Sequence, residues 1–75
     1  MFDKNIFAQR FKSLRINKKL SQDNLADELS VTKTFVSDIE RARRTTTLEK
    51  CCEIADYFDV SLDYLVGRSD DPSRH

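Results

Sequence analysis

Residues 22–41, QDNLADELSVTKTFVSDIER, carry the most informative pattern in this chain. Apolar residues recur in both of its halves at the spacing of a helix face: Leu25, Ala26, Leu29, Val36 and Ile39. Ser21 and Thr32 each stand directly before one half and offer a side-chain oxygen to cap a helix N-terminus. We therefore predict two short helices three residues apart, crossing at a steep angle with the small Ala26 at the crossing.

A longer helix is predicted on the N-terminal side of this pair. Phe7, Phe11 and Leu14 follow one another at i, i+4 and i+7, with charged residues between them. This spacing predicts an amphipathic helix over about residues 4–18.

Two further helices are predicted on the C-terminal side. Thr47 is a plausible cap for a helix over 48–58, and Ser61 caps one over 62–66. The apolar face of the first consists of Leu48, Cys51, Ile54, Ala55 and Phe58. Gly67 is expected to end the second in the left-handed conformation. The chain is thus predicted to be all-α with five helices.

Length and composition agree with one small helical domain. The 75 residues include one Gly and one Pro, and 35% are charged, which is typical of a helical chain. No apolar run reaches the roughly 20 residues that span a bilayer, and residues 1–20 are not built like a signal peptide. We expect a soluble, cytoplasmic domain over 1–67, with no membrane partner, and a flexible tail over 68–75.

Side chains for metal binding or catalysis are scarce. His75 is the only histidine, and no Gly-rich phosphate loop is present. Cys51 and Cys52 are neighbours, which point about 100° apart on a helix and cannot form an unstrained disulfide. We therefore expect no enzyme activity, no metal and no cofactor, with Cys51 a small core residue and Cys52 partly exposed. Two thiols in so short a chain indicate a reducing compartment.

Charge is divided unevenly along the chain, although the net charge is zero. Residues 1–44 carry ten Lys or Arg against six Asp or Glu, and residues 45–75 carry three against seven. The basic N-terminal half suits a polyanionic partner, because the local electrostatic potential, and not the net charge, governs association with a polyanion. The same pattern also fits an ordinary solvated surface.

Beyond the pattern of helices, the sequence resembles the helix-turn-helix of phage repressors and Cro proteins, the XRE family. The motifs that carry the likeness are the stretch at 22–41, KSLR at 12–15, IERAR at 39–43 and VSLDYLVG at 60–67. The resemblance covers roughly residues 6–67 and implies a lambda-repressor-like fold of five helices. It also implies a helix-turn-helix motif over 22–41 with its recognition helix over 33–41.

The resemblance assigns roles to particular residues. Its implied base-reading residues, on the recognition helix in the major groove, are Lys33, Thr34, Ser37 and Asp38. Its implied phosphate contacts are Ser21, Gln22, Thr32, Arg41, Arg43 and Arg44. Arg15 and Glu40 are implied to form a structural ion pair between the first helix and the recognition helix. For each base-reading residue, an ordinary exposed polar side chain is the alternative. Phe35 is expected to pack in the core and could reach a thymine methyl.

Two residues depart from the family pattern. Ser30, in the turn, and Ala42, after the recognition helix, stand where the family often has glycine. A residue with a Cβ held at positive φ costs roughly 1 kcal/mol relative to glycine. At Ser30 either the strain is borne or the geometry differs. At Ala42 we expect the helix to run on for part of a turn, which would displace Arg43 and Arg44 from their usual places.

The function implied is sequence-specific binding of double-stranded DNA by a transcriptional regulator, most simply a repressor of phage or mobile-element type. A dimer on a two-fold operator is expected, because one small domain makes few base contacts. By analogy with the family, its surface would involve Tyr57, Val60, Tyr64 and Val66, and Tyr64 could equally be a core residue. The alternative is an antitoxin or interaction module whose acidic C-terminal half binds a protein. A protein partner such as an antirepressor or toxin is left unidentified.

Overall fold

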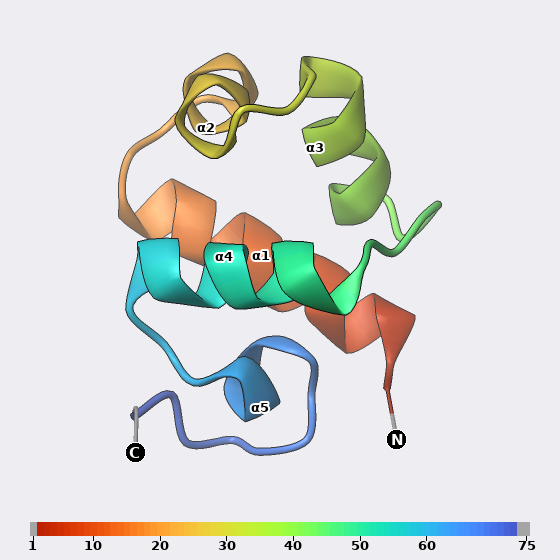
Figure 1. Cartoon of the computed structure of the whole chain (residues 1–75), viewed down its shortest axis with the longest axis vertical. Coiled ribbons are helices and arrows are strands. Elements are labelled where there is room, and N and C mark those ends of the chain that lie inside the picture. The colour runs from red at the N-terminus through yellow and green to blue at the C-terminus, as the bar shows by residue number, and fades with distance from the viewer. Residues whose placement is uncertain (1, 74–75) are drawn as a thin grey trace.

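The computed structural model describes residues 2–73 and forms five helices in that range (Figure 1). In chain order they are α1 (Lys4–Asn17), α2 (Gln22–Leu29), α3 (Lys33–Glu40), α4 (Leu48–Phe58) and α5 (Leu62–Leu65). The predicted all-α fold is confirmed, and the helix bounds differ from the predicted ones by no more than one residue. Helices α1 and α4 cross the middle of the molecule, with α2 and α3 at one end and α5 at the other (Figure 1). None of the helices in residues 2–73 has the length and apolar character to cross a membrane.

Every helix begins at a residue whose side chain accepts a hydrogen bond from the first turn. The predicted caps Ser21, Thr32, Thr47 and Ser61 do so. Asp3 does the same for α1, accepting from the backbone of Asn5 and Ile6. Because such caps satisfy N–H groups that have no partner inside the helix, they determine where each helix starts.

The core lies where α1 and α4 meet the other helices. Its fully buried large side chains are Phe7, Phe11, Leu25, Val36, Ile39, Ile54 and Leu65. Phe11 and Phe58 pack edge to face, with ring centroids 6.3 Å apart, and join α1 to α4. Cys51 is buried and Cys52 exposed, as predicted. The prediction for Leu48 is wrong, because its side chain is 71% exposed. Leu48 is the first residue of α4, so its side chain lies beyond the edge of the core.

Residues with left-handed backbone conformation follow several helices and change the direction of the chain. Ser30 and Ala42 both have φ of 58°. The expected extension of α3 at Ala42 is wrong, since α3 ends at Glu40 and the strained conformation is adopted. The backbone N–H groups of Ala42 and Arg43 donate to the last carbonyls of α3, on Ile39 and Asp38, which stabilises the turn. Gly67 ends the α5 region with φ of 88°, as predicted.

Residues 68–73 run along α5 through contacts with Arg10. The Arg10 guanidinium donates from Nη1 to the carbonyls of Tyr64 and Ser69 and from Nη2 to the Asp70 carboxylate. The predicted flexible tail over 68–75 therefore has contacts as far as Pro72, whose carbonyl accepts from the backbone N of Ser61 at 3.0 Å. Its last two residues, including His75, lie outside the described residues, and the flexibility of the tail stays a prediction.

Candidate nucleic-acid interface

Helix α3 packs one side against the core and exposes the other side to solvent. Val36 and Ile39 are fully buried, which turns the opposite side of the helix outward. Lys33 and Thr34 are exposed on that side, and Ser37 and Asp38 are half-buried. The structure thus brings together the four residues that were predicted to read bases. Lys33 can donate to guanine, the Thr34 methyl can meet a thymine methyl, Ser37 can donate or accept, and Asp38 can accept from an exocyclic amino group.

The N-termini of α2 and α3 present hydroxyl and backbone N–H groups of the kind that suit an anion. Ser21 Oγ accepts from the backbone N of Asn24 at 3.0 Å, and Thr32 Oγ1 accepts from that of Phe35 at 3.0 Å. Each hydroxyl still has its own proton to donate. Helix N-termini also have partial positive charge, so both ends suit a phosphate oxygen.

Gln22 has a contact that sequence reasoning missed. Its Nε2 donates to Glu40 Oε1 at 3.2 Å, which ties the side chain to α3. The second amide hydrogen of that nitrogen is still able to donate to a phosphate. The polar residue types gave no signal for this contact, because the two residues are 18 positions apart in the chain.

Arg15 and Glu40 form the ion pair on which the position of α3 depends. Arg15 Nε lies 2.6 Å from Glu40 Oε2, and Arg15 Nη2 donates to Glu40 Oε1 at 3.0 Å. The third donor, Nη1, reaches the Leu20 carbonyl at 2.8 Å. With 12% and 4% of the two side chains exposed, the pair is largely buried. It joins α1 to the end of α3 in a bidentate geometry that permits little rotation.

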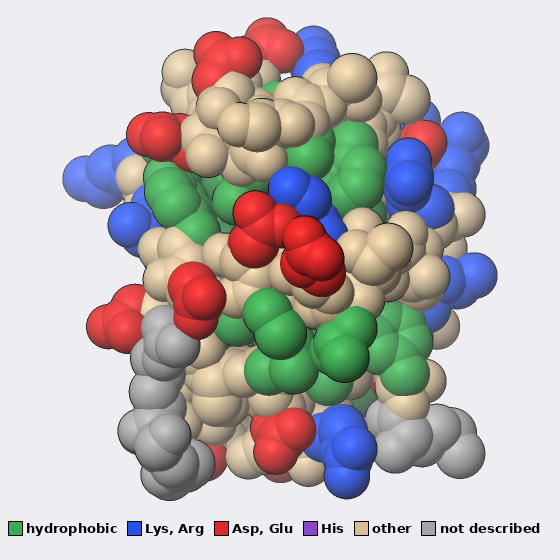
Figure 2. Space-filling model, viewed as in Figure 1, with side chains coloured by type: hydrophobic (Ala, Val, Ile, Leu, Met, Phe, Trp, Pro, Cys, Tyr) green, Lys and Arg blue, Asp and Glu red, His purple; other side chains and the backbone are tan. Residues whose placement is uncertain are grey.

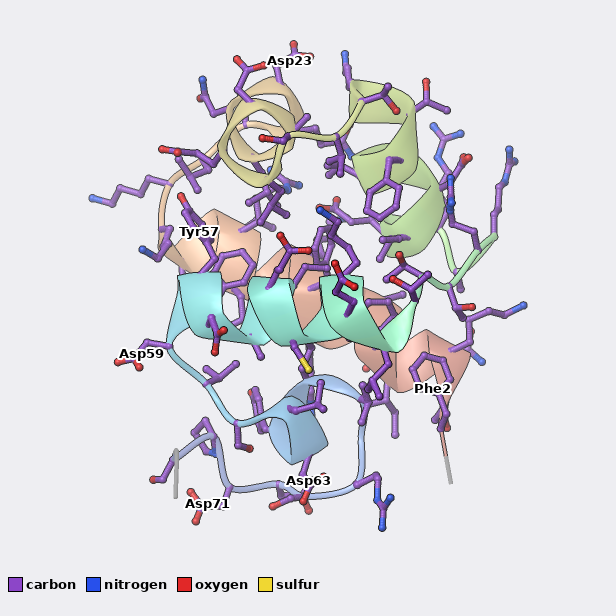
Figure 3. The ribbon with its side chains drawn as sticks, viewed as in Figure 1. Phe2, Asp23, Tyr57, Asp59, Asp63 and Asp71 are labelled. Carbon is purple, nitrogen blue, oxygen red and sulfur yellow. The ribbon has the colours of Figure 1, made fainter. Side chains whose placement is uncertain are left out.

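Basic side chains gather beyond the end of α3. Arg41 caps the helix C-terminus, and Arg43 and Arg44 follow it on the exposed loop. Figure 2 shows Lys and Arg side chains along the edge of the molecule beside α3 and this loop. Asp63 and Asp71 lie around α5 at the opposite end, Asp59 lies beside the end of α4, and Asp23 lies on α2 (Figure 3). Residues 21–44 carry four Lys or Arg against five Asp or Glu, so the excess positive charge of the N-terminal half lies on and just after α1. The cations beside α3 and its following loop form a local group that a polyanion can approach.

Two short helices joined by a tight turn, the second with an outward polar face and cations beyond its end, define a helix-turn-helix DNA-binding domain. Residues 11–65 match the family model described as helix-turn-helix, HTH_3. The chain belongs to this family, the XRE type of helix-turn-helix, whose members are DNA-binding regulators and not a class of enzymes.

The chain is similar to several curated proteins. It is 33% identical over 67 residues to the HTH-type transcriptional regulator YobD of Bacillus subtilis, covering 89% of this chain and 60% of YobD. It is 30% identical over 59 residues to the immunity repressor of Bacillus phage phi105, covering 79% of this chain and 41% of the repressor. It is 35% identical over 51 residues to the control protein C.BamHI of Bacillus amyloliquefaciens, covering 67% of this chain and 63% of C.BamHI. The chain thus spans about 40 to 60% of YobD and the phage repressor.

Solved structures agree with the fold. The restriction-modification controller protein C.AhdI of Aeromonas hydrophila superposes with a TM-score of 0.75 at 32% identity, over 84% of this chain and 96% of that one. The hypothetical transcription factor NHTF from Neisseria superposes with a TM-score of 0.77 at 28% identity, over 84% and 72%.

Proposed function

We propose that this chain is a sequence-specific DNA-binding transcriptional regulator that acts as a repressor on a two-fold operator. The observation that carries the proposal is the outward polar face of α3, which the Arg15–Glu40 pair holds in one orientation. Relatives named as an immunity repressor and a control protein support it. An operator-bound domain represses by occupying DNA and needs no second activity. The interaction-module alternative is not favoured, since these relatives are named for regulation.

In this proposal, base reading and phosphate binding fall to different residues. Lys33, Thr34, Ser37 and Asp38 read base edges in the major groove. The phosphate contacts are made by the two helix N-termini and the arginines after α3, namely Ser21, Gln22, Thr32, Arg41, Arg43 and Arg44. A regulator of this kind acts where the DNA is, so a cytoplasmic location is part of the proposal.

We propose that two copies pair through an apolar surface between α4 and α5, called here the α4–α5 face and made of Phe2, Leu48, Leu62 and Val66. Phe2 and Leu48 are 43% and 71% exposed, and Figure 2 shows hydrophobic side chains reaching the surface between these helices. Asp63 and Arg68 line the same hollow. In a two-fold dimer, Asp63 of each copy can therefore lie beside Arg68 of the other.

Three of the residues expected at the dimer surface have other contacts. Val60 is buried, and the ring of Tyr64 lies under the Arg10 guanidinium at 4.2 Å. Tyr57 packs edge to face on Phe58 and lies under Lys18. Of the four, Val66 belongs to the α4–α5 face.

Selection of a random duplex pool against the purified protein tests the proposal. We expect a two-fold sequence motif to emerge. Lys33→Ala should relax preference at defined base positions at a cost of about 1–3 kcal/mol. Arg43→Ala should weaken binding to all sequences alike and reduce the salt slope by about 1. Weak binding that shows no motif and disappears at modest salt would overturn the proposal.

A further inference from the structure

Arg44 has a contact on α3 that the assigned roles do not explain. Its guanidinium carbon lies 4.6 Å from the centroid of the Phe35 ring. Phe35 is partly buried and packs against the core, and it follows the proposed base-reading residue Thr34. A cation over an aromatic face at this distance is held by the ring quadrupole. The loop arginine is therefore attached to the recognition helix itself.

The turn at Ala42 makes this contact possible. Its left-handed backbone and the bond from Arg43 N to Asp38 O, at 2.8 Å, reverse the chain after α3. Arg44 then returns alongside the helix to a ring nine positions earlier. An α3 that continued through Ala42 would carry the arginine away from Phe35.

The contact with Phe35 leaves the terminal nitrogens of the guanidinium available. Arg44 Nε has a long contact to the Thr45 carbonyl at 3.4 Å. Neither Nη atom of Arg44 donates to another residue within 2–73. With its central carbon held over the Phe35 ring, the guanidinium keeps both Nη groups for the bidentate recognition that phosphate favours.

We infer that Phe35 is a positioning residue that holds Arg44 ready for one DNA phosphate at the rim of the groove that α3 enters. This inference rests on the proposed function. A long side chain that must be ordered on binding weakens affinity by about two- to tenfold. Stacking on Phe35 orders Arg44 before DNA arrives. Arg43, one residue earlier, is exposed and lies over no aromatic ring among residues 2–73, so it is the matched comparison.

A double-mutant cycle on binding of the selected duplex, measured at several salt concentrations, tests the inference. Phe35→Leu keeps an apolar side chain but removes the ring face. We expect it to weaken binding by about two- to tenfold with an unchanged salt slope. Arg44→Ala should weaken binding and reduce the slope by about 1. In the Arg44→Ala background, Phe35→Leu should change affinity by less than about twofold.

Two further variants separate positioning from packing. Phe35→Tyr keeps the ring and should bind like the wild type. Phe35→Leu combined with Arg43→Ala should show additive losses, because Arg43 does not touch the ring. Additive losses with Arg44→Ala, or a loss in Phe35→Tyr equal to that in Phe35→Leu, would overturn the inference while the wild type still binds. A wild-type chain that selects no duplex would overturn both the inference and the proposed function.

Discussion

Arg15 and Glu40 lie 25 residues apart in the chain and meet in a bidentate ion pair that connects α1 to the end of α3. Gln22 adds a hydrogen bond from α2 to the same carboxylate. Three helices therefore converge on one Glu40 side chain, at the C-terminal end of α3. The stability of the fold and the orientation of the recognition helix consequently depend on the same contact.

Removal of one partner of this pair should be costly. Glu40→Ala leaves the Arg15 guanidinium largely buried without its counter-charge, which lowers the free energy of unfolding by about 3–5 kcal/mol. Urea denaturation followed by circular dichroism measures the change. The double variant Arg15→Met and Glu40→Leu should lose much less than Glu40→Ala, because no charge is stranded. A loss below about 1 kcal/mol for Glu40→Ala would show that solvent already screens the pair.

Glycine at position 42 should stabilise the protein. Ala42 has φ of 58°, a conformation that glycine adopts without a Cβ penalty. Ala42→Gly is expected to raise the free energy of unfolding by about 0.5–1 kcal/mol, and the melting temperature by several degrees. Ser13→Gly, on the exposed side of α1, is the control and should lower it by a similar amount. Equal effects at the two positions would contradict this account of the turn.

A charge on the α4–α5 face should separate the proposed dimer without unfolding the monomer. Leu48→Glu places a carboxylate where burial of a leucine would contribute about 1.5–3 kcal/mol, so the dimer dissociation constant should rise tenfold or more. Sedimentation equilibrium measures it. Ile16→Glu is the matched control, because Ile16 is also an exposed apolar residue, 53% exposed, but lies on α1 outside this face. Equal dimer dissociation constants for the two variants would exclude the α4–α5 face as the dimer interface.

The two cysteines should differ in reactivity. Burial raises the pKa of the Cys51 thiol above its ordinary value, and the neighbouring Cys52 raises it further. With single variants Cys52→Ala and Cys51→Ala, iodoacetamide at pH 8 should label Cys51 roughly tenfold or more slowly than Cys52. Mass spectrometry follows the reaction, and urea should remove the difference. Comparable rates in the folded protein would show that Cys51 is accessible.

The same shift has a consequence for stability in alkaline solution. Because the folded pKa of Cys51 exceeds the unfolded one, its stabilising contribution is complete below the unfolded pKa. That contribution is lost as the pH rises through the folded pKa. In the Cys52→Ala variant, denaturation midpoints should therefore fall more steeply above pH 9 than in the double alanine variant.

Local patterns in the sequence determined the helices of this protein. Capping by Ser21, Thr32, Thr47 and Ser61 and the spacing of apolar residues involve neighbours within about four positions, so a linear reading predicts them to within one residue. The burial of Val36 and Ile39 follows from the same spacing, and with it the outward side of α3. The family resemblance rests on these local features too.

Tertiary structure alone decided the contacts that join distant residues. The exposure of Leu48 depends on where α4 extends past the core, and the capture of Gln22 by Glu40 depends on how α2 and α3 cross. At Ala42, a sequence reading weighs the Cβ penalty of about 1 kcal/mol. It does not show the hydrogen bonds that the turn makes to α3. Phe35 reaches Arg44 only after that turn, because long-range contacts depend on the three-dimensional path of the chain and no short-range pattern encodes it.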